Sequence, residues 1–204
     1  MLEAARLYAI TPDGDPESLV ALVGAVLRGG ADVIQLRHKT LPRGRLLELA
    51  RRLAEVVHGA GRLFIVNDHL DIALLAGADG VHLGDDDLPL EDARRLAPPG
   101  FLVGASANRP DSARAAVAAG ADYLGAGPAF ATTVKPDKAV IGPRGVAAVA
   151  AAVTVPVFAI GGIEEATIAE LVAAGVHRAC VISGLARASD PEAAARRLRA
   201  ALTS

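Results

Sequence analysis

The sequence is poor in cysteine and aromatic residues: it has one cysteine, no tryptophan and only 3% Phe, Trp and Tyr. One cysteine excludes an internal disulfide, and the apolar residues around Cys180 predict a small buried side chain there. An excess of charge of one sign is also missing, because the formal net charge is -2 over 204 residues. This balance gives no reason to expect nucleic acid or an acidic membrane surface as a partner.

The amino-terminal segment lacks the apolar stretch of a secretory signal, because Glu3 and Arg6 fall within it. One uncharged run, residues 145–163, is long enough to be weighed as a membrane span. Pro156 and the pair Gly161–Gly162 interrupt this run, so we expect it to form a helix and a buried strand instead. These features predict a soluble cytoplasmic protein.

Lysine is scarce as well, since 3 lysines stand against 18 arginines. The lysines are Lys39, Lys135 and Lys138. Arginine evidently supplies the general surface charge, so a lysine is a candidate wherever a compact ammonium group is wanted beside a phosphate. Chance placement is the alternative interpretation.

The chain is rich in hydrophobic residues, at 52%, and short apolar segments alternate with Ala- and Leu-rich segments of helical character. We expect strands at 7–11, 33–37, 63–66, 80–83, 102–106, 123–127, 157–161 and 179–183. We expect helices at 16–28, 42–58, 70–76, 89–96, 110–119, 144–152, 164–174 and 191–202. The strands are continuously apolar, as in a parallel sheet that helices cover.

A short repeat, Gly-Ala-Asp, links an expected helix to the next strand at residues 30–32, 77–79 and 120–122, with a weaker copy at 175–177. The glycine suits the left-handed position at a helix end. Eight strand–helix units predict a single domain over residues 1–204, of the α/β class, with a (β/α)8 TIM-barrel fold. An open doubly wound sheet is the alternative, but it usually has fewer strands.

Carboxylates follow two neighbouring strands of the expected barrel. Asp68 follows the strand at 63–66, and the run Asp85–Asp87 follows the strand at 80–83. Because the carboxyl ends of parallel strands lie on one face, these side chains are candidates for an oxygen site that holds a hard cation such as Mg²⁺. The alternative is that they are solvated caps of the following helices.

Other polar residues follow the remaining strands, where a TIM barrel carries its function. They include Gln35, Arg37, His38, Lys39, Asn67, Ser106 and Asn108. Gly161–Gly162 and Ser183–Gly184 precede expected helices, a position that is typical of phosphate sites in barrels. The longest connection, residues 128–143, is a candidate lid because of its length, its threonines and its lysines, with a plain surface loop as the alternative.

The histidines indicate less. His58 and His177 fall at a helix end and in a link, and His82 lies within a strand, where we expect a satisfied core histidine. His38 and His69 fall on the same face as the candidate site but show no metal-ligand spacing. We find no Cys-His or Ser-His-Asp arrangement that would indicate covalent catalysis.

Taken along the whole chain, the sequence resembles the thiamine phosphate synthase family. The resemblance rests on QLRHK at 35–39, ND at 67–68, GADGVHLGDDDLP at 77–89, Ser106, GPAFATTVK at 127–135, AIGGI at 159–163 and VISG at 181–184. It implies a TIM-barrel transferase that joins a pyrimidinylmethyl diphosphate to the ring nitrogen of a thiazole phosphate. Thiamine phosphate and pyrophosphate would be released, without a protein nucleophile.

The resemblance also implies roles for particular residues. Asp68 and Asp87 would hold Mg²⁺, and Lys135, Arg37 and Lys39 would be catalytic through the departing diphosphate. The pyrimidine diphosphate would bind to residues of the QLRHK motif and three further strand ends: Gln35, Leu36, Arg37, His38, Lys39, Asn67, Ser106 and Lys135. The thiazole phosphate would bind to Thr132, Thr133, Val134, Gly162, Ile182 and Ser183.

The sequence departs from the usual family pattern at five positions: Asp85 for Gln, Asn108 for His, Ala131 for Pro, Val134 for Thr and Gly184 for Ala. The alternatives to a synthase are a thiazole tautomerase-like isomerase and a non-catalytic barrel that binds thiazole phosphate. The expected partners are small-molecule substrates, and a homo-oligomer is left open.

Overall fold

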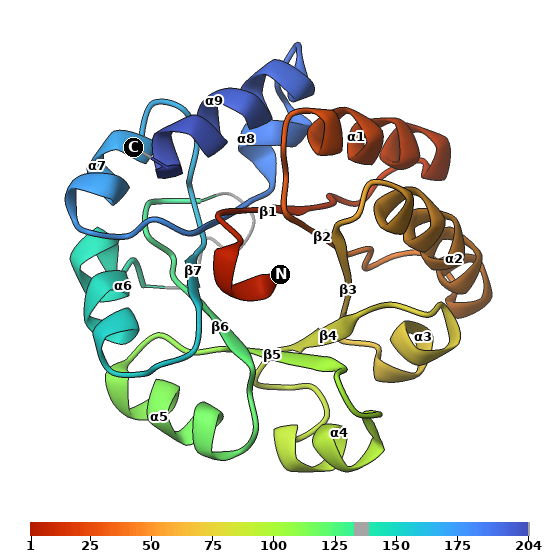
Figure 1. Ribbon diagram of the computed structural model, residues 1–204, viewed down its shortest axis with the longest axis horizontal. Helices are drawn as coiled ribbons and strands as arrows, with labels where there is room; N and C mark the ends of the chain where they lie inside the picture. Colours follow the sequence, from red (N-terminus) through yellow and green to blue (C-terminus); the bar gives the residue numbers. More distant parts are fainter. Residues whose placement is uncertain (133–138, 204) are drawn as a thin grey trace.

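The computed structural model describes residues 1–132 and 139–203, and its parallel strands close into a barrel in their order along the chain. The strands are β1 (Leu7–Ile10), β2 (Val33–Leu36), β3 (Leu63–Asn67), β4 (Gly80–Leu83), β5 (Leu102–Ser106), β6 (Tyr123–Ala126), β7 (Val157–Ala159) and β8 (Ala179–Val181). Figure 1 shows the helices as a ring around them. The expected (β/α)8 barrel is confirmed.

The helices follow the strands in turn. They are α1 (Pro16–Arg28), α2 (Arg43–Gly59), α3 (Leu70–Leu75), α4 (Leu90–Leu96), α5 (Pro110–Ala118), α6 (Gly142–Ala151), α7 (Ile168–Ala173), α8 (Ser183–Ala186) and α9 (Pro191–Thr203). At the start of α1 a proline occupies the first turn, where its missing N–H costs nothing, and Asp15 caps the helix by accepting from the Ser18 N–H at 3.0 Å.

Three elements differ from the expectation by more than two residues at one end or were not expected. The helix expected at 164–174 begins only at Ile168, because Thr167 ties the preceding turn together: its Oγ1 donates to the Gly162 carbonyl and accepts from the Glu164 N–H, both at 3.0 Å. The short helices α8 and η1 (Leu2–Ala4) were not expected at all. Both are single turns, too short to show a helical periodicity in the sequence.

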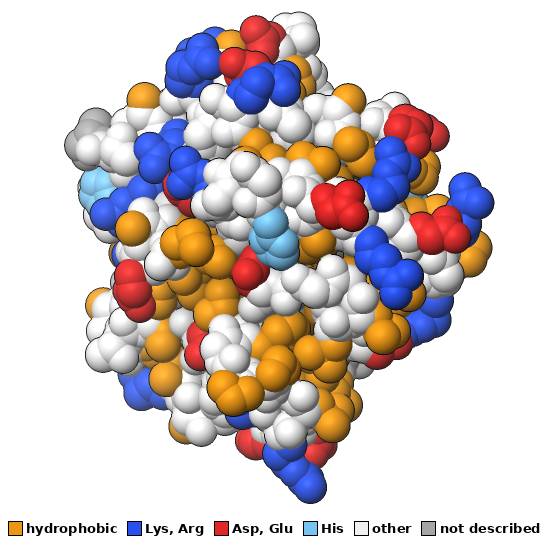
Figure 2. Space-filling view, turned by 45° about the vertical axis from the view of Figure 1, so that its right-hand side comes forward, with side chains coloured by type: hydrophobic (Ala, Val, Ile, Leu, Met, Phe, Trp, Pro, Cys, Tyr) orange, Lys and Arg blue, Asp and Glu red, His pale blue; other side chains and the backbone are white. Residues whose placement is uncertain are grey.

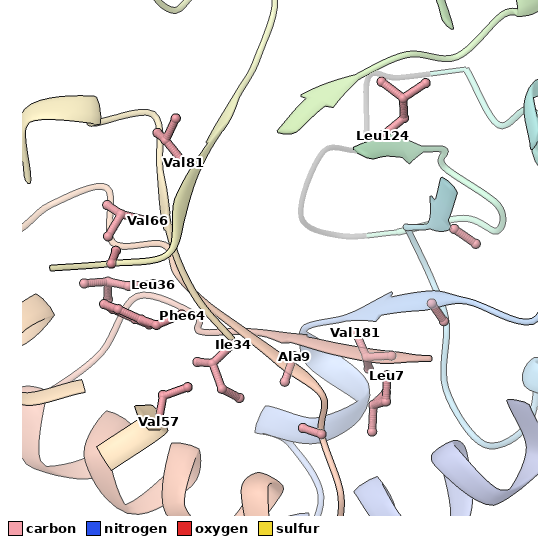
Figure 3. Packing of buried hydrophobic residues seen from close by; sticks show 14 of the residues in the cluster. Leu7, Ala9, Ile34, Leu36, Val57, Phe64, Val66, Val81, Leu124 and Val181 are labelled. Carbon is pink, nitrogen blue, oxygen red and sulfur yellow. The ribbon is translucent and has the colours of Figure 1, made fainter. Parts of the chain in front are cut away.

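Strand residues alternate between two apolar cores. Side chains such as Ile34, Phe64 and Val66 point outward and pack against the helices, for example near Val57 of α2 (Figure 3). Their neighbours in sequence point into the barrel and form a second cluster: Ala5, Tyr8, Ile10, Val33, Leu63, Ile65, Tyr123, Phe158 and Cys180. The expectation that Cys180 is a small buried side chain is confirmed, with 5% exposure.

The Gly-Ala-Asp repeats form a recurrent clasp at the amino ends of the strands. Each aspartate precedes an even-numbered strand, and its carboxylate accepts the main-chain N–H of a residue at the start of the preceding strand. Its own N–H donates to the carbonyl of that same residue, at 2.8 Å in every case. The pairs are Asp32 with Leu7, Asp79 with Phe64, and Asp122 with Val103. The repeat therefore fixes neighbouring strands to each other.

The amino-terminal segment closes this end of the barrel. Leu2 of η1 and Ala5 pack against the interior cluster, and Figure 1 shows η1 lying across the opening. On the face drawn in Figure 2, acidic and basic side chains are interspersed, without an extended region of one sign. Among the described residues, every helix is too short or too polar to cross a membrane, and the uncharged run 145–163 divides between α6 and β7.

Candidate active site at the mouth of the barrel

A cavity of about 690 Å³ opens at the carboxyl ends of the strands. Its lining comes from the ends of all eight strands and the loops that follow them, so residues far apart in sequence meet there. The volume falls within the range of sites that enclose small organic ligands. In a TIM barrel this is the face that carries the chemistry.

Asp68 and Asp87 meet in this cavity. The two carboxyl groups share a hydrogen bond, and Asp87 Oδ2 also accepts from the Gly84 N–H at 2.7 Å. Burial and the neighbouring Asp68 raise the pKa of Asp87. Burial alone would raise the pKa of Asp68 too, but hydrogen bonds with Lys39 and Asp87 outweigh it and lower that pKa. The repulsion between the two adjacent carboxylates is therefore not fully offset by the nearby positive charge, and a bound cation would reduce it.

The backbone at Asp68 supports a functional role. Asp68 has φ of +64°, the one positive φ among the non-glycine residues that the structure describes. A left-handed residue costs about 1 kcal/mol or more, and such strain clusters at active sites. The Asp68 N–H donates to the His82 carbonyl at 2.8 Å, which continues the β3–β4 ladder by one residue and turns the chain there.

Two basic side chains share the cavity lining with these carboxylates. Lys39 Nζ pairs with Asp68 Oδ2, and the Arg37 guanidinium lies 3.7 Å from Asp13. Both cations line the cavity. His38, between them, is buried and faces away: its Nδ1 accepts from the Leu41 N–H at 3.1 Å, which leaves Nε2 to donate to the Gly14 carbonyl at 2.9 Å. His38 therefore anchors the loop that presents Arg37 and Lys39.

A polar network forms the floor of the cavity. Gln35 Nε2 donates to Tyr8 Oη at 2.9 Å, and Tyr8 Oη lies 3.0 Å from Tyr123 Oη. Burial raises the pKa of Tyr8, so this phenol stays neutral and fixes the Gln35 amide. Gly104 makes room for the network, because a Cβ there would lie 2.1 Å from the Tyr123 ring. Within residues 1–132 and 139–203 the carbonyl end of Gln35 has no hydrogen-bond donor, and the residue belongs to the cavity lining.

His82 and Ser106 form the adjoining wall, from β4 and β5. His82 Nε2 lies 3.2 Å from Ser106 Oγ, and its ring centre lies 5.6 Å from that of Tyr123. The prediction that His82 is a satisfied core histidine is wrong, since the ring is half-buried and lines the cavity. The ring and the hydroxyl together offer donors and an acceptor to a planar, nitrogen-rich ligand.

The opposite wall comes from the loops after β7 and β8. Gly162 has φ of +64°, and a Cβ there would lie 2.4 Å from the Ala131 carbonyl, so only glycine allows the loop after β6 to approach. This approach is fixed by the Phe130 N–H, which donates to the Gly161 carbonyl at 3.0 Å. Ser183 and Gly184 belong to α8, which has 4 residues.

The structure brings most of the predicted site residues together around the cavity. Those that line it are Gln35, Arg37, Lys39, Asn67, Asp68, Asp87, Ser106, Thr132, Gly162, Ile182 and Ser183. Leu36 points outward into the core beneath the helices, and His38 faces its own loop, so neither side chain lines the cavity. Thr133, Val134 and Lys135, together with the central part of the candidate lid at 128–143, lie outside the described residues.

Sequence reasoning missed several lining residues, notably Tyr8, Glu164 and Arg187. Tyr8 could have been found from its position two residues before the end of a strand, since alternate strand residues point inward. Asn108, expected among the polar residues that follow the strands, accepts the Gly127 N–H at 3.1 Å and so fixes the end of β6. No sequence signal pointed to Glu164 or Arg187, because Glu164 lies in an irregular turn and Arg187 follows the single-turn helix α8.

Comparisons with known proteins agree with this geometry. Residues 7–185 match the model of a family described as thiamine monophosphate synthase. A thiamine-phosphate synthase of Methanoculleus marisnigri is 49% identical over 95% of this chain and 93% of its own. One of Moorella thermoacetica is 47% identical over 97% and 95%. A solved thiamine phosphate pyrophosphorylase from Pyrococcus furiosus superposes with a TM-score of 0.88, at 38% identity, over 98% of this chain and 96% of that one.

Proposed function

Because the chain belongs to the thiamine monophosphate synthase family, and so condenses a pyrimidinylmethyl diphosphate with a thiazole phosphate, we propose that this reaction takes place in the cavity at the barrel mouth. The proposal assigns the diphosphate to the wall formed by the loops after β2, β3 and β4. It assigns the thiazole phosphate to the opposite wall, formed by the loops after β7 and β8.

The observation that carries this assignment is the pair Asp68–Asp87, which Lys39 contacts and which lines one cavity with Arg37. A diphosphate brings several negative charges, which two carboxylates would repel unless a cation intervened. The donor set fits Mg²⁺: the ion prefers oxygen ligands, and it commonly takes one or two carboxylates and completes its shell with phosphate oxygens and water. In the described part of the chain, His, Cys, Asp and Glu form no cluster of three or more.

Asp68 and Asp87 would therefore hold Mg²⁺, which when bound would neutralise the diphosphate and make it a better leaving group. Arg37 and Lys39 would take up the negative charge that develops as the bond between carbon and diphosphate oxygen breaks. Lys135, from the motif resemblance, would add a third cation. Because the pyrimidine ring stabilises the carbon that loses the diphosphate, no protein nucleophile is needed.

The floor of the cavity and the adjoining wall of His82 and Ser106 would hold the pyrimidine. The Gln35 carbonyl, fixed by the donation of its amide to Tyr8, would accept a hydrogen bond from the amino group of the ring. Ser106 and Asn67 would bind beside it. The thiazole nitrogen then needs only to be held near the pyrimidine methylene carbon, which is a positioning task for Gly162, Ile182, Ser183 and Thr132.

One experiment tests the proposed function. The purified chain is mixed with both substrates and Mg²⁺, and released pyrophosphate and thiamine phosphate are measured together. A synthase forms both in equal amounts and forms neither when a substrate or Mg²⁺ is omitted. A tautomerase would isomerise the thiazole alone without pyrophosphate release, and a binding barrel would change neither substrate. Either of the last two results would reject the proposal.

A further inference from the structure

The two walls of the cavity differ in their charged side chains. The wall after β2 to β4 carries Arg37 and Lys39 against its aspartates. On the opposite wall, formed by the loops after β7 and β8, the charged residues among those that the structure describes are Arg187 and Glu164. A phosphate bound on this wall would face one carboxylate, so a cation is needed to offset that repulsion and the charge of the phosphate itself.

The helices of this wall contribute little positive potential. The α7 helix begins only at Ile168, six positions after Gly162, and α8 has 4 residues. The partial charge at a helix end comes from several aligned peptide units and fades beyond the first turn, so a phosphate near Gly162 gains little from either helix. Main-chain and hydroxyl donors alone would leave its double negative charge largely uncompensated.

Arg187 is placed to supply that charge. It follows α8 directly, where its main-chain N–H donates to the Ser183 carbonyl at 3.0 Å, so the residue is tied to the turn that carries Ser183. Within residues 1–132 and 139–203, its guanidinium has no hydrogen bond and no ion pair, whereas Lys39 already pairs with Asp68. A guanidinium that holds no structural contact is available to a ligand.

We propose that Arg187 is a specificity-determining residue that binds the phosphate of the thiazole substrate. The inference rests on the proposed function and adds to it the group that recognises the phosphate. Arginine suits this role because its planar fork donates two hydrogen bonds to one phosphate. Glu164 acts in the opposite sense and weakens the same binding.

The test compares Arg187→Gln with wild type at varied concentrations of each substrate. We expect the KM for the thiazole phosphate to rise about tenfold, the typical effect of losing one charge-assisted hydrogen-bond pair, while the KM for the pyrimidine diphosphate stays within twofold. The preference for thiazole phosphate over the unphosphorylated thiazole alcohol should fall by the same factor. Arg187→Lys should recover part of both effects, and Glu164→Gln should lower the KM for the thiazole phosphate.

Arg114→Gln is the matched control, because Arg114 lies on the outer helix α5, pairs with Asp111 and does not line the cavity among the described residues. Thermal unfolding of each variant checks that the fold is retained. An unchanged KM and an unchanged preference in Arg187→Gln overturn the inference, as does an effect seen only with a carboxylated thiazole. If wild type forms no thiamine phosphate, the proposed function fails first, so the two failures are distinguishable.

Discussion

Aspartates at the two ends of the barrel have opposite surroundings. At the amino ends, Asp32 accepts the N–H groups of Arg6 and Leu7 at 2.9 and 3.1 Å and also faces Arg62 and Arg199. At the carboxyl ends, Asp68 and Asp87 face each other and share Lys39. An aspartate carboxylate is thus surrounded by hydrogen-bond donors and cations at the amino ends, whereas at the carboxyl ends two carboxylates have fewer of them.

This difference separates a structural from a functional role. A carboxylate whose acceptor positions are filled by main-chain N–H groups and arginines contributes to stability and has no capacity left for a ligand. A pair of carboxylates held side by side costs stability in the free protein and gains from binding a cation. Substitutions at the mouth should therefore lower turnover, and substitutions at the amino ends should lower the free energy of unfolding. Four experiments test this difference.

The largest effect is expected at the mouth. Asp68→Asn and Asp87→Asn each keep size and shape but remove one charged ligand, so turnover should fall by roughly a hundredfold or more. The Mg²⁺ concentration for half-maximal rate should rise in both variants. The free energy of unfolding should stay the same or increase in Asp87→Asn, because the pKa of that carboxyl is raised in the folded protein. Magnesium titrations of pyrophosphate release measure this, with Asp92→Asn on the outer helix α4 as control. If both variants keep the wild-type dependence on Mg²⁺, these aspartates are ordinary helix caps and not metal ligands.

At the other end, Asp32→Asn should affect stability instead. The side chain is 8% exposed and its arginines are 39% and 34% exposed, so we expect a loss of about 2–3 kcal/mol rather than the full 3–5 kcal/mol of a dry pair. Urea unfolding measures the loss, and kcat/KM at a temperature where the variant is folded should match wild type. A fall in kcat/KM without a loss of stability would contradict the division between the two ends.

Arg94 at the same end offers a smaller effect. Its guanidinium donates to the Phe101 and Gly120 carbonyls, both at 2.9 Å, and pairs with Asp122. Arg94→Met keeps the apolar part of the side chain and removes these donors, so unfolding free energy should fall by about 1–2 kcal/mol. The same urea experiment applies. If the midpoint of urea unfolding is unchanged, water replaces the guanidinium as a donor without loss of unfolding free energy.

The smallest effect is expected for His58, which lies 2.9 Å from Asp79. The two side chains are 41% and 33% exposed, so solvent screens their interaction. His58→Asn should change the unfolding free energy by less than about 1 kcal/mol. The main-chain contact of Asp79 with Phe64, at 2.7 Å, remains in this variant. Should His58→Asn destabilise as much as Asp32→Asn, the ion pairs and not the main-chain clasps would hold the amino ends together.

Much of the fold was predictable because each element carries its own boundary signals. The strands at 80–83 and 102–106 and the helix at 16–28 agree with the structure residue for residue. The strand expected at 157–161 ends at Ala159, since Gly161 has φ of +95° and leaves the extended conformation. Such an angle is permitted by glycine but not required by it, so the sequence alone could not place that end.

The direction of side chains was harder to predict than their location. In a barrel covered by helices both faces of each strand are buried, so hydrophobicity does not distinguish inward from outward positions. This explains why His82 was assigned to the core and why the motif residue Leu36 was grouped with Gln35, although only Gln35 faces the cavity. A residue such as Arg187, which follows the single-turn helix α8, can be placed at the cavity only from the three-dimensional path of the chain.

The clasps also group the first six strands of the barrel into three pairs. Asp32 joins β1 to β2, Asp79 joins β3 to β4, and Asp122 joins β5 to β6, so three successive pairs of strands are internally fastened at the same end. The links between these pairs, such as the exposed residues 59–61 after α2, lie on the face opposite the mouth. New chain termini placed at such a link would leave every clasp and every cavity residue in place, which makes this barrel a natural scaffold for circular permutation.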